Sequence, residues 1–219
     1  MPGPHHDQPV LETGEPLEQA QAAAILVHGR GATPEDILYS LAPVLDLPGF
    51  AFLAPAAAGN AWYPNPFTAP PETNEPWLSS ALDKLDQVLA RVEEHVPASQ
   101  VMLLGFSQGA CLTLEYVARH ARGYGAVVGL SGALIGPPGT PRAYAGSLDG
   151  TPVLLSASDP DPYVPADLVR EAGGVLRQLG GEVQVRIYPG MGHTINRDEI
   201  VDTRNLMAAL LRREEEVKP

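Results

Sequence analysis

Val101-Met-Leu-Leu-Gly-Phe-Ser-Gln-Gly109 is the stretch that decides the fold of this 219-residue chain. Its first half is an apolar run short enough to be a strand buried on both faces of a sheet. A helix is predicted directly after it, over residues 108–120, so Ser107 falls at a strand-to-helix junction. Gly105 and Gly109 suit a sharp turn with a strained backbone, because larger side chains there would collide with the flanking elements. The alternative is a plain tight turn whose serine has no chemical role.

Strands and helices alternate on both sides of this junction. Upstream, an apolar run at residues 22–27 opens into the glycine-rich loop His28-Gly-Arg-Gly31. The alternation predicts a single α/β domain over residues 1–219, with a mostly parallel central sheet and helices on both faces. The proline-rich segments 54–76 and 136–152 are expected to be loops, without a separate lid domain. The further strands are expected at residues 50–54, 126–130, 153–156 and 183–188.

Composition and charge argue against several classes of partner. The formal net charge of −12, with no dense Lys/Arg cluster, disfavours nucleic acid. No stretch approaches the roughly 20 apolar residues of a membrane helix, and the N-terminus lacks the pattern of a secretory signal, so a soluble, cytoplasmic protein is the default expectation. The lone Cys111 excludes an intrachain disulfide. Because it lies one helical turn past Ser107, it is expected to face the core.

The first nine residues are expected to form a flexible tail that precedes the domain. Two neighbouring histidines in it, His5 and His6, make a poor metal site because no cysteine or acidic cluster lies nearby. No feature of the sequence requires a metal or an organic cofactor. Both a monomer and a homodimer remain open.

A serine hydroxyl becomes an effective nucleophile only when an oriented base takes its proton. For a serine at such a junction, the partners are expected after later strands, in the order acid and then histidine. His193 ends the loop Pro189-Gly-Met-Gly-His193 and is the predicted base, with an exposed loop histidine as the alternative. Asp159 and Asp161 both follow the strand at 153–156. Spacing alone leaves the choice between the two acids open.

The chemistry also needs two backbone N–H donors for the oxyanion of a tetrahedral intermediate. The expected positions are Gln108, directly after the nucleophile, and Arg30, in the loop after the strand at 22–27. The claim for Arg30 concerns its N–H, since its side chain is expected to be a solvated surface charge. His28 is expected to pack under this loop and not to act as a second base.

Aromatic residues gather in the loop after the strand at 50–54, which should leave the carboxyl edge of the sheet, where ligands bind in this architecture. Trp62 and Tyr63 are therefore candidates for an apolar substrate pocket, with core packing as an equal alternative. Trp77 is expected to pack in the core. Leu134 and Val164 flank the motifs and are further pocket candidates, although core packing explains either of them.

Four motifs together resemble one known family, the phospholipase/carboxylesterase group of α/β-hydrolases, which includes acyl-protein thioesterases and small bacterial carboxylesterases. The resemblance spans residues 22–211 and implies the α/β-hydrolase fold. It also implies that Asp161 is the acid and that Arg30 and Gln108 supply the oxyanion donors. The chain departs from the family pattern at Ala157-Ser158, where His-Gly is usual. The motifs are H-G-R-G-A at 28–32, G-F-S-Q-G at 105–109, S-D-P-D-P-Y-V-P at 158–165 and G-M-G-H at 190–193.

The sequence therefore predicts a serine carboxylesterase that hydrolyses small to medium acyl esters through an acyl-enzyme at Ser107, with a Ser-Asp-His triad and a small-molecule ester as its partner. A thioesterase or lysophospholipase of the same family is the alternative within this chemistry. The segment W-Y-P-N-P-F-T-A-P at 62–70, where thioesterases usually differ, argues against the thioesterase. A non-catalytic ligand-binding protein is the alternative from another class, and the presence of all three triad residues argues against it.

Overall fold

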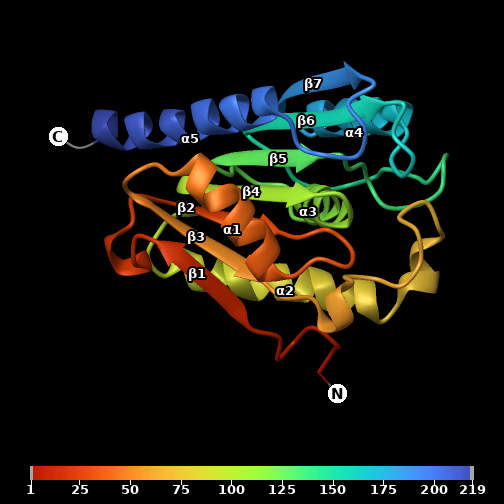
Figure 1. Ribbon diagram of the computed structural model, residues 1–219, viewed down its shortest axis with the longest axis horizontal. Coiled ribbons are helices and arrows are strands. Elements are labelled where there is room, and N and C mark those ends of the chain that lie inside the picture. The colour runs from red at the N-terminus through yellow and green to blue at the C-terminus, as the bar shows by residue number, and fades with distance from the viewer. Residues whose placement is uncertain (1, 218–219) are drawn as a thin grey trace.

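The computed structural model describes residues 2–217, with side chains described up to residue 212. These residues form a seven-stranded sheet in the order β1-β3-β2-β4-β5-β6-β7, covered by helices on both faces (Figure 1). β1 pairs antiparallel with β3, and every other neighbouring pair is parallel. The predicted α/β architecture is confirmed. The strands are β1 Val10–Gly14, β2 Ala22–Val27, β3 Phe50–Pro55, β4 Val101–Phe106, β5 Ala126–Leu130, β6 Pro152–Asp159 and β7 Glu182–Pro189.

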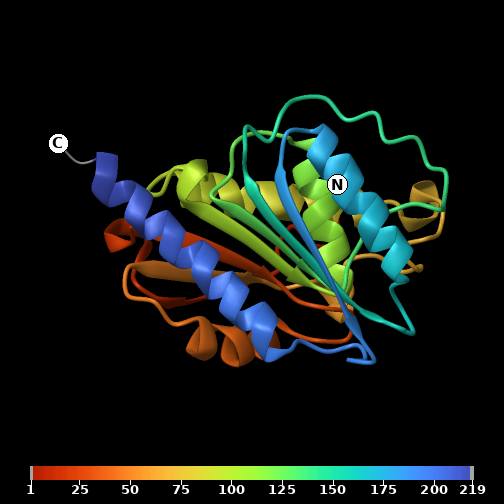
Figure 2. The same ribbon diagram turned by 90° about the horizontal axis from the view of Figure 1, so that it is seen from above.

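The helices divide between the two faces of the sheet because alternate residues of each buried strand point to opposite sides. Ala22, Ala24 and Leu26 of β2 pack with α1 and α5, whereas Ala23 and Ile25 pack with the other three helices (Figure 2). The α-helices are α1 Pro34–Leu45, α2 Trp77–Glu93, α3 Gln108–Arg119, α4 Ala166–Gln178 and α5 Arg197–Val217. Short 3₁₀ helices lie at Leu17–Gln19, Ala58–Asn60, Pro71–Asn74 and Ala98–Gln100.

The β4–α3 junction has the geometry that its glycines predict. Ser107 has φ +55°, in the left-handed region that non-glycine residues rarely adopt. A Cβ on Gly105 would lie 2.3 Å from the carbonyl oxygen of Gly109, and a Cβ on Gly109 would lie 2.1 Å from that of Val27. The first turn of α3 therefore rests directly on the ends of β4 and β2, and glycine alone fits between them.

The first nine residues differ from the sequence prediction of a flexible tail, which is wrong for the described residues 2–9. The side chain of His5 is buried, with 0 % exposure, and its ring lies 5.4 Å from the rings of both Trp62 and Trp77. Its Nε2 pairs with the carbonyl oxygen of Trp62 at 2.9 Å, and its Nδ1 accepts from the N–H of Ala58 at 3.0 Å. These long-range contacts hold the segment in place. The chain then continues into β1, an edge strand that the sequence analysis did not predict.

A second buried histidine supports the same loop. His28 Nε2 accepts from the N–H of Ala57 at 3.2 Å, and its Nδ1 pairs with the carbonyl oxygen of Gly29 at 2.8 Å. The expected structural role of His28 is confirmed. Trp77 is half-buried and packs against the edge of the main hydrophobic cluster without being fully inside it. Because one nitrogen of each imidazole accepts a hydrogen bond from a backbone N–H, that nitrogen carries no proton and both rings are neutral. Burial lowers the pKa of His5 and of His28 below the ordinary 6.5.

α4 contains two consecutive glycines with different surroundings. A Cβ on Gly173 would meet Val185 Cγ2 of β7 at 2.7 Å, whereas a Cβ on Gly174 would have nothing within 4 Å. Close packing of α4 on β7 therefore requires glycine at the first position only. Among the described residues, no helix combines the length and the apolar character needed to cross a membrane.

We predict opposite effects for two Gly→Ala substitutions. Gly109→Ala should lower the free energy of unfolding by about 1–3 kcal/mol, because the new methyl group overlaps backbone oxygens. Gly174→Ala should raise it by about 0.5–1 kcal/mol, because alanine favours the helix and meets no obstacle. Urea unfolding measures both values. Equal effects of the two substitutions would contradict the close approach of α3.

Stability should also depend on the two buried histidines. The unfolded chain binds protons with the ordinary histidine pKa of 6.5, whereas the folded chain binds them only at lower pH. Stability that is fully present above pH 6.5 should therefore be lost as the pH falls below that value. Urea unfolding between about pH 7.5 and about pH 5.5 tests this dependence. His5→Gln should flatten the decline, while the same change at the exposed His95 should leave it intact.

Candidate active site

The predicted site residues meet at the carboxyl edge of the sheet, where parallel strands end together. Ser107 follows β4, Asp161 follows β6 and His193 follows β7. His193 Nε2 lies 2.8 Å from Ser107 Oγ, and His193 Nδ1 lies 2.8 Å from Asp161 Oδ2. Three side chains that are far apart in the sequence thus form one continuous hydrogen-bonded row.

The structure brings Asp161, and not Asp159, to the histidine. The side chain of Asp161 is completely buried, and its Oδ1 accepts from the N–H groups of Tyr163 at 2.8 Å and Val164 at 3.0 Å. Burial by itself would raise the pKa of Asp161, but the hydrogen bonds from His193 and these two N–H groups outweigh burial and lower it. Asp159 is exposed at the end of β6, and its carbonyl oxygen accepts from the N–H of Gly190.

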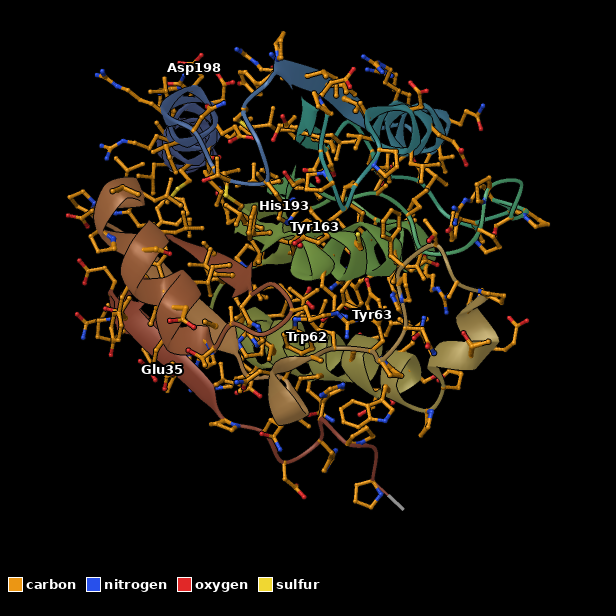
Figure 3. The ribbon with its side chains drawn as sticks, turned by 45° about the vertical axis from the view of Figure 1, so that its right-hand side comes forward. Glu35, Trp62, Tyr63, Tyr163, His193 and Asp198 are labelled. Carbon is orange, nitrogen blue, oxygen red and sulfur yellow. The ribbon has the colours of Figure 1, made fainter. Side chains whose placement is uncertain are left out.

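The ionised acid fixes the tautomer of the histidine. A carboxylate only accepts hydrogen bonds, so His193 Nδ1 carries the proton and donates to Asp161. The lone pair of Nε2 then faces the hydroxyl of Ser107. The rings of Phe106 and Tyr163 lie 5.1 and 4.9 Å from the imidazole. Figure 3 shows Tyr163 beside His193. Ser107 is thus paired with an imidazole that is held by a carboxylate and has aromatic neighbours.

The two expected oxyanion donors lie beside this row. A Cβ on Gly29 would be 3.4 Å from Ser107 Cβ, so the loop that carries Arg30 runs directly against the serine. Gln108 is the first residue of α3, where backbone N–H groups have no partner within the helix. No protein acceptor in the described part of the chain takes a hydrogen bond from the N–H of Arg30 or of Gln108.

The side chains of Arg30 and Gln108 have a function that the sequence did not reveal. The guanidinium of Arg30 donates to the carbonyl oxygens of Tyr63, Pro64 and Asn65 at 2.7, 3.0 and 3.0 Å. Gln108 Nε2 donates to the Tyr63 carbonyl at 2.8 Å, and its Oε1 accepts from the N–H of Trp62 at 3.0 Å. The expectation that the Arg30 side chain is only a solvated surface charge is wrong. The side chain donates hydrogen bonds to carbonyl oxygens of an irregular loop that pairs with no strand.

A cavity of about 600 Å³ opens beside Ser107. Of the four predicted pocket residues, Tyr63 and Val164 line it, whereas Trp62 and Leu134 do not. Trp62 lies beneath the loop with its indole N–H bonded to the His28 carbonyl oxygen, and Leu134 is buried in the core. For Trp62 and Leu134, the core alternative is the correct one.

The cavity also has walls that the sequence analysis missed. Phe67 lies in the aromatic loop after β3, and Tyr163 lies in the motif at 158–165 that contains Asp161. Both lie in segments that the sequence analysis had already connected with the site. Tyr163 is 68 % exposed, at the mouth of the cavity. Cys111 is buried as expected but also borders the cavity, and burial raises the pKa of its thiol to about 12. The thiol therefore stays protonated and apolar in character.

The described residues contain no group of three or more His, Cys, Asp or Glu side chains arranged to hold a metal ion. The site itself combines the Ser107–His193–Asp161 row, the N–H groups of Arg30 and Gln108, and a largely apolar cavity.

Comparison with known proteins finds similar structures and sequences. The crystal structure of a phospholipase/carboxylesterase from Dyadobacter fermentans superposes with a TM-score of 0.88 and 42% sequence identity, covering 92% of this chain and 97% of that one. Acyl-protein thioesterase 1 of Debaryomyces hansenii is 29% identical over 125 residues, 56% of this chain and 54% of the relative. A probable carboxylesterase of Oryza sativa is 27% identical over 126 residues, 56% of this chain and 47% of the relative.

The matches to these two curated relatives thus span only about half of their length. The family model described as Phospholipase/Carboxylesterase, in contrast, matches residues 8–211, nearly the whole chain. Together with the fold and the Dyadobacter structure, this match shows that the chain belongs to the phospholipase/carboxylesterase family of α/β-hydrolases.

Proposed function

We propose that the protein is a serine hydrolase that cleaves carboxylic esters through an acyl-enzyme at Ser107. The observation that carries the proposal is the position of His193, which lies 2.8 Å from both the Ser107 hydroxyl and the Asp161 carboxylate. A hydroxyl in contact with a neutral imidazole, itself held by a buried carboxylate, is the arrangement that activates serine for attack on a carbonyl carbon.

In the first half of the reaction, Ser107 Oγ attacks the ester carbonyl carbon while His193 Nε2 takes the hydroxyl proton. Asp161 balances the positive charge that this transfer creates on the imidazole. The carbonyl oxygen becomes an oxyanion, which accepts hydrogen bonds from the N–H groups of Arg30 and Gln108. His193 then gives its proton to the departing alkoxide, and the acyl group stays on Ser107.

In the second half, a water molecule replaces the alcohol. His193 takes a proton from the water as it attacks the acyl carbon, and the same two N–H groups stabilise the second oxyanion. Proton return to Ser107 releases the carboxylic acid.

The cavity favours a small or medium acyl ester. Its volume of about 600 Å³ lies within the range of small-molecule sites, and Phe67, Val164 and the proline-rich loop give it apolar walls. Thioester hydrolysis uses the same attack and remains the alternative, since one relative is named an acyl-protein thioesterase.

We predict that Ser107→Ala and His193→Ala each lower kcat/KM by at least about 10³-fold while the fold stays intact, because each removes a member of one proton-transfer unit. Asp161→Asn should lower kcat/KM by a similar factor, because it leaves His193 in the wrong tautomer. Asp159→Asn is the matched control two residues away and should retain near-normal turnover. A larger loss for Asp159→Asn than for Asp161→Asn would move the acid and contradict the proposed row.

Hydrolysis of p-nitrophenyl esters from acetate to decanoate, with wild type beside Ser107→Ala, tests the activity itself. We expect a Ser107-dependent rate with an optimum at short or medium acyl chains, because longer chains exceed the apolar cavity. The matched thioester series separates the two chemistries. A folded protein that turns over no ester and does not react with a fluorophosphonate would contradict the proposed function.

A further inference from the structure

The loops that carry Asp161 and His193 leave neighbouring strands but extend beyond the last strand pairing. β6 and β7 are paired up to Asp159 opposite Pro189. Beyond that pair, no backbone ladder fixes the distance between the acid and the base. Other contacts must hold the two loops in register.

The His193 loop is not fixed by packing at its glycines. Gly190 and Gly192 have φ +64° and +81°, and a Cβ on either would have nothing within 4 Å. Glycine in such open surroundings permits many backbone conformations. The position of His193 therefore depends on the hydrogen bonds that this short loop makes.

One buried hydroxyl connects both loops. Ser158 Oγ accepts from the N–H of Gly192 at 2.8 Å and donates to the carbonyl oxygen of Pro160 at 3.0 Å. Gly192 is the residue before His193, and Pro160 is the residue before Asp161. Ser158 itself is completely buried in β6, the most regular part of this region. A single side chain thus bonds to the residue that precedes the base and to the residue that precedes the acid.

The far end of the His193 loop is held separately, from the same strand. Ser156 Oγ donates to Glu199 Oε1, and the other oxygen of Glu199 accepts from the N–H of Asn196 at the start of α5. Ser156 and Ser158 lie two residues apart in β6 and so point to the same face. With α5 anchored by Ser156, the segment left to be fixed is the glycine-containing part that Ser158 contacts.

We propose that Ser158 is a positioning residue for the reaction, and this inference rests on the function proposed above. Its hydroxyl sets the separation of Asp161 and His193 and thereby the direction of Nε2 toward Ser107. Both hydrogen-bonding capacities are needed, because one loop offers a donor and the other an acceptor.

Ser158→Ala tests the proposal. We expect kcat on a p-nitrophenyl ester to fall about 10- to 100-fold, the loss that displacement of a reacting group by about 1 Å can cause. KM should change by less than about twofold, because Ser158 does not line the cavity. The rate at which a fluorophosphonate labels Ser107 should fall in parallel with kcat. Ser158→Gly is a second variant that removes the same hydroxyl, and it should show the same loss.

Thr151→Val provides a matched control, because Thr151 directly precedes the opposite end of β6. Thr151 is also buried, and its hydroxyl also accepts from one backbone N–H, that of Tyr124, and donates to a carbonyl oxygen, that of Leu148. Its loss should lower stability in urea by an amount similar to that of Ser158→Ala. It should leave kcat and the labelling rate unchanged, because neither reacting loop is near it.

Proton NMR supplies a signature that a purely structural role would not alter. The Nδ1 proton between His193 and Asp161 should give a downfield signal in the wild type, and this signal should shift or broaden in Ser158→Ala and remain in Thr151→Val. Wild-type kcat and labelling rate in both folded Ser158 variants would overturn the positioning role alone. A wild type that neither turns over esters nor reacts with the fluorophosphonate would instead overturn the proposed function.

Discussion

The close approach of α3 to the ends of β2 and β4 is the constraint on which the rest of the site depends. It requires glycine at positions 105 and 109, and it forces Ser107 into a conformation with positive φ. The same approach places the first N–H groups of α3 beside the serine and aims the side chain of Gln108 at Tyr63. The proposed nucleophile, the proposed oxyanion donor at Gln108 and the Tyr63 wall of the cavity are therefore positioned by one contact between a helix and a sheet.

The loops around the serine are joined mainly by bonds between side chains and backbone. Arg30 and Gln108 both donate to the Tyr63 carbonyl, while His28 and His5 accept from the successive N–H groups of Ala57 and Ala58. On the other side of the site, the Ser158 side chain forms similar hydrogen bonds to the loops that carry Asp161 and His193. Such bonds fix irregular backbone that has no strand to pair with. The site is rigid because every approaching loop is bonded to a second one.

Much of this arrangement can be predicted from the sequence, and the reasons are local. Residues 101–109 contain the apolar strand, the two glycines and the serine in one short segment. The sharp turn at Ser107 can therefore be predicted from this segment alone. The positions of the acid and the histidine after later strands can also be predicted, because parallel strands end at one edge of the sheet. Spacing did not distinguish Asp159 from Asp161, and only the family resemblance favoured Asp161. The choice between the two acids depends on which carboxylate can also accept hydrogen bonds from the N–H groups of Tyr163 and Val164. Loop geometry decides this. Trp62 and Tyr63 illustrate the same limit, since neighbours in sequence lie on opposite sides of one loop, and only one of them reaches the cavity.

The burial of His5 could not be predicted because its partners, Trp62 and Trp77, lie more than fifty residues away. Its position also has a practical meaning. The ring supports the backbone of Trp62 from behind, and the adjacent Tyr63 forms part of the cavity wall. Shortening the chain by its first nine residues would remove this support and leave the Trp62 carbonyl without its partner. Residues 2–9 thus support one wall of the cavity through Trp62, although none of them lines the cavity itself.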